Sequence, residues 1–198
     1  MGLIRKEKGS NSMRVIAGKA RRLQLKTIEG MNTRPTQDRT KETMFNVINN
    51  CVPGCYFLDL FSGSGGIGIE AASRGAKKCV LVENNRRAYD CIMYNLKYTK
   101  LEDVSKVMFT TVESAIKQLD NVGEHFDIVF MDPPYNHLFE KDVLNYLKES
   151  NLISNESIII VEASNETEFD YLEDMGYKII KEKVYKTNKH VFIQLCGE

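Results

Sequence analysis

Hydrophobic residues occur in short uninterrupted runs from residue 56 onward, and most runs are followed by a stretch with helical periodicity. Uninterrupted apolar runs are typical of parallel strands that are buried on both faces of a sheet. Strands are therefore expected at 56–60, 79–83, 106–110, 126–131 and 157–162, with helices near 67–74, 85–99, 113–120, 139–149 and 166–175. The last two runs, 177–187 and 190–196, follow each other without a helix and predict a hairpin.

This alternation predicts an α/β fold with a doubly wound core. The sheet is expected to have seven strands and to be mostly parallel, with one antiparallel strand and helices on both faces. Upstream, residues 14–18 and 22–27 predict a small basic β-hairpin. Arg34 and Pro35 then precede a helix that is expected to run to about Asn50, with Thr36 as its candidate N-cap.

Composition is that of a soluble globular protein: 198 residues, 42% hydrophobic and 27% charged. No apolar run approaches the ~20 residues that a membrane helix needs, so no membrane partner is expected. The five cysteines are an odd number, which favours reduced thiols and a cytoplasmic location. Cys51 and Cys55 have the spacing of a metal pair, but no second pair completes a zinc site, so no metal is expected.

Charge is distributed unevenly, although the net charge is zero. Residues 1–50 carry 11 Lys and Arg against 4 Asp and Glu, and the remaining 148 residues carry 16 against 23. A basic arm on an acidic body fits either a phosphate-binding surface or a solvated tail. Three segments are expected: residues 1–12 as a disordered lead or a cloning remnant, with Met13 as an alternative start, 13–50 as the basic hairpin and helix, and 51–198 as the catalytic domain.

The stretch LDLFSGSGGIGIEAASRG (58–75) lies between an expected strand and an expected helix. Its Gly63, Gly65 and Gly68 match the G-x-G-x-x-G pattern of dinucleotide sites, which alone indicates only a sharp turn and a close approach. Asp59, at the end of the strand, would repel a pyrophosphate but attract an ammonium group. The loop is therefore expected to bind S-adenosylmethionine, which carries an ammonium and a sulfonium, rather than NAD.

Glu83 ends the second strand, where its carboxylate could accept hydrogen bonds from two ribose hydroxyls. Either nucleotide would suit it, and the alternative is an ordinary solvated strand end. The residues expected to bind the cofactor are Asp59, Phe61, Ser62, Gly63, Ser64, Gly65, Gly68, Glu83, Asn84 and Val112.

The fourth expected strand ends in Asp132, Pro133, Pro134 and Tyr135. In a doubly wound sheet this strand lies beside the first, so Asp132 should face the same crevice as the glycine loop. The Asp132 carboxylate and the Pro133 carbonyl could hold the exocyclic amino group of a base and orient its lone pair. Pro134 would stiffen the loop and Tyr135 would stack on the base; the alternative is a simple turn that ends a strand.

The segments MRVIAGKARRLQL (13–25), TRPTQDRTKETMFNVI (33–48), LDLFSGSGGIGIEAASRGA (58–76) and FDIVFMDPPY (126–135) together resemble the RsmD family of bacterial 16S rRNA guanine-N2 methyltransferases. The resemblance implies a Rossmann-like class I methyltransferase that uses S-adenosylmethionine. The substrate it implies is one guanine of 16S rRNA, within an assembling small ribosomal subunit. The residues expected to contact RNA, or to close over the site, are Arg14, Lys19, Arg21, Arg22, Arg34, Thr36 and Arg39.

Arg34 could pair with the cofactor's carboxylate, bind an RNA phosphate, or tie the arm to the domain. Two positions depart from the family pattern: Thr111 stands where relatives place an acid, and Lys186 follows Tyr185 where a glycine is typical. An adenine-N6 methyltransferase is the nearest alternative, because the D-P-P-Y motif serves both amino groups. An NAD-dependent oxidoreductase and a non-catalytic RNA-binding module are the alternatives from other classes.

Overall fold

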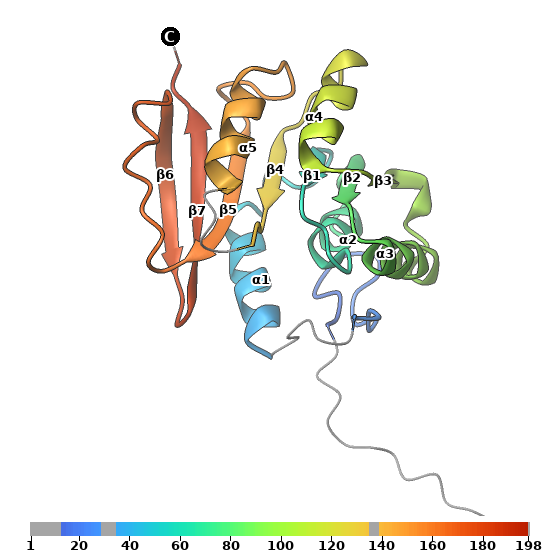
Figure 1. Ribbon diagram of the computed structural model, residues 1–198. Coiled ribbons are helices and arrows are strands. Elements are labelled where there is room, and N and C mark those ends of the chain that lie inside the picture. The colour runs from blue at the N-terminus through green and yellow to red at the C-terminus, as the bar shows by residue number, and fades with distance from the viewer. Residues whose placement is uncertain (1–12, 29–34, 135–138, 198) are drawn as a thin grey trace, which may run out of the picture.

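Figure 1 shows the computed structural model, which describes residues 13–28, 35–134 and 139–197, with only the backbone at 35–37. The expectations for residues 1–12, Arg34 and Tyr135 therefore lie outside the described residues. So does the side chain of Thr36.

A single seven-stranded sheet forms the centre of the fold, with strand order β3-β2-β1-β4-β5-β7-β6. The five strands from β3 to β5 are parallel, whereas β7 runs antiparallel to both of its neighbours. The strands are β1 (Tyr56–Asp59), β2 (Lys78–Glu83), β3 (Ser105–Phe109), β4 (Ile128–Met131), β5 (Ile158–Ser164), β6 (Tyr177–Val184) and β7 (Asn188–Leu195). The predicted sheet, with its one antiparallel strand, is confirmed.

Helices cover both faces of the sheet, as predicted (Figure 1). The helices are α1 (Pro35–Val47), α2 (Gly66–Ser73), α3 (Arg86–Thr99), α4 (Val112–Asn121) and α5 (Phe139–Lys148), with a 3₁₀ turn at Glu102–Val104. Leu58 packs in one core with α4 and α5, and its neighbour Phe57 packs in the other core with α1, α2 and α3. This alternation follows from the period of two of a strand.

The helix expected near 166–175 is absent, and that prediction was wrong. The segment instead forms a series of turns, one of them closed by an i→i−3 hydrogen bond from Leu172 N to Phe169 O. Like charges four residues apart, such as Asp170 and Asp174, destabilise a helix. The side chains of Phe169 and Leu172 are buried and hold the turns against the core.

The N-terminal arm, residues 13–28, contains a short hairpin, as predicted. Arg14 and Gln24 form an antiparallel bridge, and hydrogen bonds from Val15 N to Leu23 O and from Leu25 N to Met13 O continue the pairing. Buried Val15 and Leu25 anchor the arm in the core that α1, α2 and α3 share. Because α1 begins at Pro35, Thr36 lies inside the helix and is not its N-cap.

The arm is attached by the buried carboxylate of Glu70, on α2, which is 0% exposed. Its two oxygens accept hydrogen bonds from Ile16 N at 2.8 Å and Ala17 N at 3.0 Å. The same carboxylate pairs with Arg74 at 2.8 Å and with Lys41 of α1 at 3.4 Å. One acid therefore joins the arm, α1 and α2.

The division of the chain at residue 50 stays a prediction, although Val15 and Phe45 share one core with Phe57. Within the described residues, no helix is long and apolar enough to cross a membrane.

We expect Glu70→Gln to destabilise the protein by about 3–5 kcal/mol, because it leaves the buried charge of Lys41 without its partner. Chemical denaturation measures this loss, and limited proteolysis should show faster cleavage within the arm. The control is Asp90→Asn, which breaks the exposed Arg86–Asp90 pair and should cost under about 1 kcal/mol. Equal costs for the two variants would contradict this role for Glu70.

Candidate active site

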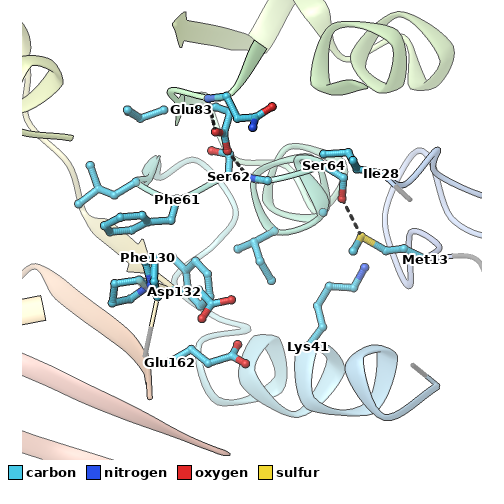
Figure 2. Close-up of a pocket in the computed structure, with 18 of the residues that line it drawn as sticks. Met13, Ile28, Lys41, Phe61, Ser62, Ser64, Glu83, Phe130, Asp132 and Glu162 are labelled. Carbon is cyan, nitrogen blue, oxygen red and sulfur yellow. Dashed lines mark hydrogen bonds between the residues drawn. The ribbon is translucent and has the colours of Figure 1, made fainter. Parts of the chain in front are cut away.

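A cavity of about 610 Å³ opens at the edge of the sheet where β1, β2, β4 and β5 have their carboxyl ends. This edge is where ligands of open α/β sheets bind. Figure 1 shows α1 and the arm lying at this end of the sheet, and Figure 2 shows side chains from all of these elements meeting around the cavity. The volume is within the range of small-molecule and cofactor sites.

The glycine loop forms one wall of the cavity. Gly65 has φ 83°, a left-handed conformation that favours glycine, and precedes α2. Gly68 has a different role, because a Cβ there would lie 2.7 Å from Cγ of Leu81, so it lets α2 pack closely on β2. Residues 61–64 of the loop line the cavity, whereas Gly65 and Gly68 lie behind it.

Asp59 does not line the cavity, although the sequence predicted that its charge would face the crevice. The side chain is 1% exposed, and Oδ2 accepts a hydrogen bond from Gly68 N at 3.0 Å. Its Oδ1 has no hydrogen-bond partner among the described residues. Burial raises the pKa of Asp59 from its ordinary value of 3.8 to about 7. Asp59 therefore supports the loop from beneath and keeps one unsatisfied acceptor.

Glu83 lines the cavity at the end of β2, as expected. Its Oε2 accepts from Gly63 N at 2.9 Å and its Oε1 from Asn85 N at 2.7 Å, so the carboxylate fixes the loop as well as facing the cavity. Asn84 lines the cavity beside it.

Val112 also lines the cavity, at the first position of α4. Thr111 is the N-cap of this helix: its side chain accepts a hydrogen bond from Ser114 N at 3.3 Å. The departure noted at this position in the sequence therefore leaves the helix capped.

Asp132, Pro133 and Pro134 follow β4 and line the same cavity, as the pairing of β1 with β4 requires. The Asp132 side chain is exposed to the cavity. Enclosure by the cavity walls, followed by the nearby charges of Glu162 and Asp59, raises the pKa of Asp132 well above its ordinary range.

Several lining residues were not predicted, and six of them come from the arm and α1. Lys41 is 6% exposed, and its Nζ donates to Arg14 O at 2.7 Å. Met13 Sδ accepts a hydrogen bond from Ser64 Oγ at 3.7 Å, and its sulfur occupies the space where a Cβ on Gly66 would lie. The other unpredicted lining residues are Thr27, Ile28, Asp38, Thr40, Leu60, Gly66, Ile67, Val82, Asn85, Thr110, Phe130, Glu162 and His190.

Glu162 could have been found from the sequence, because it is an acid that closes an apolar run, as Glu83 does. No sequence pattern indicates that α1 lies over the cavity, so Lys41 could not have been identified as a lining residue from the sequence.

The predicted RNA-binding residues lie on the outside of the molecule. Those with described side chains are all exposed, and none lines the cavity: Arg14, Lys19, Arg21, Arg22 and Arg39. Beside the arm, α3 presents two exposed rings, Tyr94 and Tyr98, which are stacked with centroids 6.3 Å apart. Nζ of Lys26 lies 5.3 Å from the Tyr94 ring centroid. The arm and α3 thus form a basic surface that also carries aromatic rings.

No group of three or more metal-ligating side chains occurs within the part of the chain that the structure describes. The fold and this site define a class I methyltransferase: a doubly wound sheet with a terminal antiparallel strand, a glycine loop after β1 and an acid after β4.

A family model described as "Conserved hypothetical protein 95" matches residues 13–194. The chain belongs to this family, which is the RsmD family that its motifs resemble. The Ribosomal RNA small subunit methyltransferase D of Haemophilus influenzae is 32% identical over 92% of this chain and 94% of its own length. YlbH of Bacillus subtilis is 36% identical over 79% of this chain and 85% of its own length.

A solved structure of yhhF from Escherichia coli has a TM-score of 0.83 and 29% identity, and the match covers 94% of this chain and 99% of that one. The similarity therefore extends over the arm, the sheet and the cavity together.

The raised pKa of Asp59 predicts a pH effect on stability. Between about pH 4 and 7 the folded carboxyl keeps a proton that the unfolded chain has lost, so stability falls as the pH rises. Asp59→Asn removes this titration. We compare the free energies of unfolding of the variant and of wild type, both without cofactor. The difference, variant minus wild type, should rise by roughly 2–3 kcal/mol from pH 5 to pH 8. Urea unfolding at both pH values measures it; a constant difference would show that Asp59 is ionised throughout.

Proposed function

We propose that this protein transfers a methyl group from S-adenosylmethionine to the N2 amino group of a guanine in 16S rRNA. The observation that carries the proposal is the shared cavity. Glu83 and the glycine loop lie on one side of it and Asp132 on the other (Figure 2), and Pro133 lines the same cavity. A cofactor site and a pair of acceptors for an amino group therefore face the same space.

The residues present fit the cofactor. Glu83 can accept hydrogen bonds from ribose hydroxyls, and the backbone N–H of Val112, which lines the same cavity, can donate to the adenine. Asp59 lies beneath the loop with Oδ1 unsatisfied, and its ionised form would favour an ammonium group bound nearby. Bound S-adenosylmethionine would supply a methyl group whose C–S bond breaks as the amino nitrogen attacks, with the electron pair left on sulfur.

Asp132 has two roles in this proposal. It accepts a hydrogen bond from the amino group, together with the Pro133 carbonyl, and so directs the nitrogen lone pair toward the methyl group. After transfer the nitrogen is positively charged and must lose a proton. The raised pKa of Asp132 makes it a stronger base than an ordinary aspartate and suits it to accept that proton.

The exposed surface of the arm and α3 supports an RNA substrate. Arginines and lysines neutralise phosphates, and exposed tyrosines stack on unpaired bases. The names of relatives such as the Haemophilus influenzae protein indicate rRNA of the small subunit. A cytoplasmic location in a bacterium follows from this substrate, and the cysteines, all of which are free, agree with a reducing compartment.

An adenine-N6 methyltransferase would use the same Asp132 chemistry and is the second candidate. An NAD-dependent oxidoreductase is less well supported, because nothing in its chemistry needs a carboxylate and two prolines facing the glycine loop.

The proposal is tested by incubating the protein with bacterial small-subunit particles and with protein-free 16S rRNA, in the presence of labelled S-adenosylmethionine. Nucleoside analysis of the product should give N2-methylguanosine. N6-methyladenosine would instead support the second candidate, and NAD binding without methyl transfer would remove both.

We expect Asp132→Ala to lose methyl transfer by about 10²–10⁴-fold, because an acceptor and a base are removed together. Its affinity for S-adenosylmethionine, measured by calorimetry, should stay within a few-fold of wild type. Asp142→Ala, an acid on α5 that does not line the cavity, is the matched control. Full activity of Asp132→Ala would refute the catalytic role.

Replacing Arg21 and Arg22 with alanine should flatten the salt dependence of RNA affinity. For every phosphate that the protein no longer neutralises, the slope of log K against log salt concentration should decrease by about 0.7–0.9. Binding measured across a salt series tests this. The matched control is the double variant Lys178→Ala and Lys181→Ala, on the exposed edge strand β6, which should leave the slope unchanged. An unchanged slope for the arm variant would make the arm a structural element only.

A further inference from the structure

Glu162 lies beside Asp132 in the cavity, and the proposed transfer step does not use it. Met131 of β4 pairs with Val161 of β5 in parallel register, so the residues that follow them stand level on neighbouring strands. Hydrogen-bonded strands are about 4.8 Å apart. The side chains of Met131 and Val161 pack in the core under α4 and α5, which directs Asp132 and Glu162 to the opposite face. Figure 2 shows their carboxylates side by side, facing the cavity.

The carboxylate of Glu162 is held by two partners on β7. Asn188 Nδ2 donates to Oε1 at 2.6 Å, and His190 Nε2 lies 3.0 Å from Oε2. His190 is 1% exposed, and its Nδ1 lies 3.1 Å from the hydroxyl of Tyr185. Both partners are set by the antiparallel register, in which Glu162 faces His190. The side chain is therefore oriented before a substrate arrives.

This orientation leaves Glu162 able to contact a ligand. Its side chain is 21% exposed and lines the cavity. Each oxygen of a carboxylate can accept more than one hydrogen bond, so the two partners on β7 can fix the group while it accepts another from a base. Its charge is close enough to Asp132 to contribute to the raised pKa of that acid.

Guanine and adenine differ at the atom next to the reacting amino group. Guanine has an N1–H donor beside its N2 amino group, so two neighbouring acceptors match its edge. Adenine has an N1 lone pair beside its N6 amino group, and a carboxylate there would be repelled. Enzymes that act on bases read this edge by hydrogen bonds in the active-site pocket. A buried acceptor left without its donor costs free energy and so discriminates between substrates.

We propose that Glu162 accepts the N1–H of the target guanine while Asp132 and the Pro133 carbonyl hold its amino group, so that Glu162 selects guanine over adenine. This inference rests on the proposed function and assigns a specificity-determining residue to it. Neither the glycine loop nor Asp132 can make this choice, because both bases carry an exocyclic amino group.

The test uses 16S rRNA joined by ligation, with either guanosine or 2-aminopurine ribonucleoside at the methylated position, reconstituted into small-subunit particles. 2-Aminopurine keeps the 2-amino group but has a lone pair at N1 in place of N1–H. For wild-type protein, kcat/KM for the guanosine substrate should be at least about 100-fold higher than kcat/KM for the 2-aminopurine substrate. Comparable values for the two substrates would overturn the proposal without any variant.

The variant Glu162→Gln isolates the contact. Its amide NH₂ can donate a hydrogen bond to N1 of 2-aminopurine, whereas its carbonyl oxygen is an uncharged and therefore weaker acceptor for N1–H of guanine. The preference for guanosine should therefore fall at least about 10-fold relative to wild type. A purely structural role would lower both rates together and leave their ratio unchanged, which would refute the inference.

The control is Glu182→Gln on β6, which is exposed and lies outside the cavity; its substrate preference should match wild type. Cofactor binding by calorimetry shows that each variant is folded. The methylated nucleoside made by the wild-type protein distinguishes failure of the proposed function from failure of the inference. Absence of N2-methylguanosine refutes both, whereas N2-methylguanosine with an unchanged ratio in Glu162→Gln refutes the inference alone.

Discussion

Parallel strands that are buried on both faces place their carboxyl ends at one edge of the sheet, and the site depends on this constraint. Asp59 and Glu83 stand at the ends of β1 and β2, and Asp132 directly follows β4. Glu162 is level with Asp132 on β5. Each of the four acids follows the apolar stretch of its strand, in β1, β2, β4 and β5. Four carboxylates are thereby brought within one cavity or directly beneath it.

The four acids have different roles because their surroundings differ. Asp59 is enclosed under the glycine loop, and its pKa is raised by burial. Glu83 is tied to backbone amides of the loop. Asp132 faces the open cavity, where a substrate can reach it, and Glu162 is fixed by side chains of β7. The antiparallel strand at the end of the chain thus contributes to the site, since only its register places His190 opposite Glu162.

The parallel sheet and most of its helices could be predicted, because apolar runs and helical periodicity are local signals. The lining positions of Glu83, Asp132 and Pro133 followed from strand order alone. The sequence predicted that Asp59 ends the first strand and faces the cavity. The side chain is instead buried beneath the glycine loop, because burial depends on how α2 packs on β2. The expected helix at 166–175 failed because repeated acids oppose a helix while Phe169 and Leu172 pack without one.

The contribution of the arm had no local signal. Glu70 binds the backbone of the arm that carries Met13, and that contact joins residues more than fifty positions apart. Lys41 of α1 pairs with the same carboxylate. A sequence pattern cannot report a contact of that separation.

The arm also touches the glycine loop directly. Asn95, buried in α3, accepts a hydrogen bond from Lys26 N and donates to the carbonyls of both Lys26 and Ser64. Met13 packs against Gly66 on the same loop. Because these contacts are direct, a ligand that displaced the arm would also displace one wall of the cavity. By linkage, such a ligand and one bound in the cavity would then change each other's affinity by the same factor, whichever binds first.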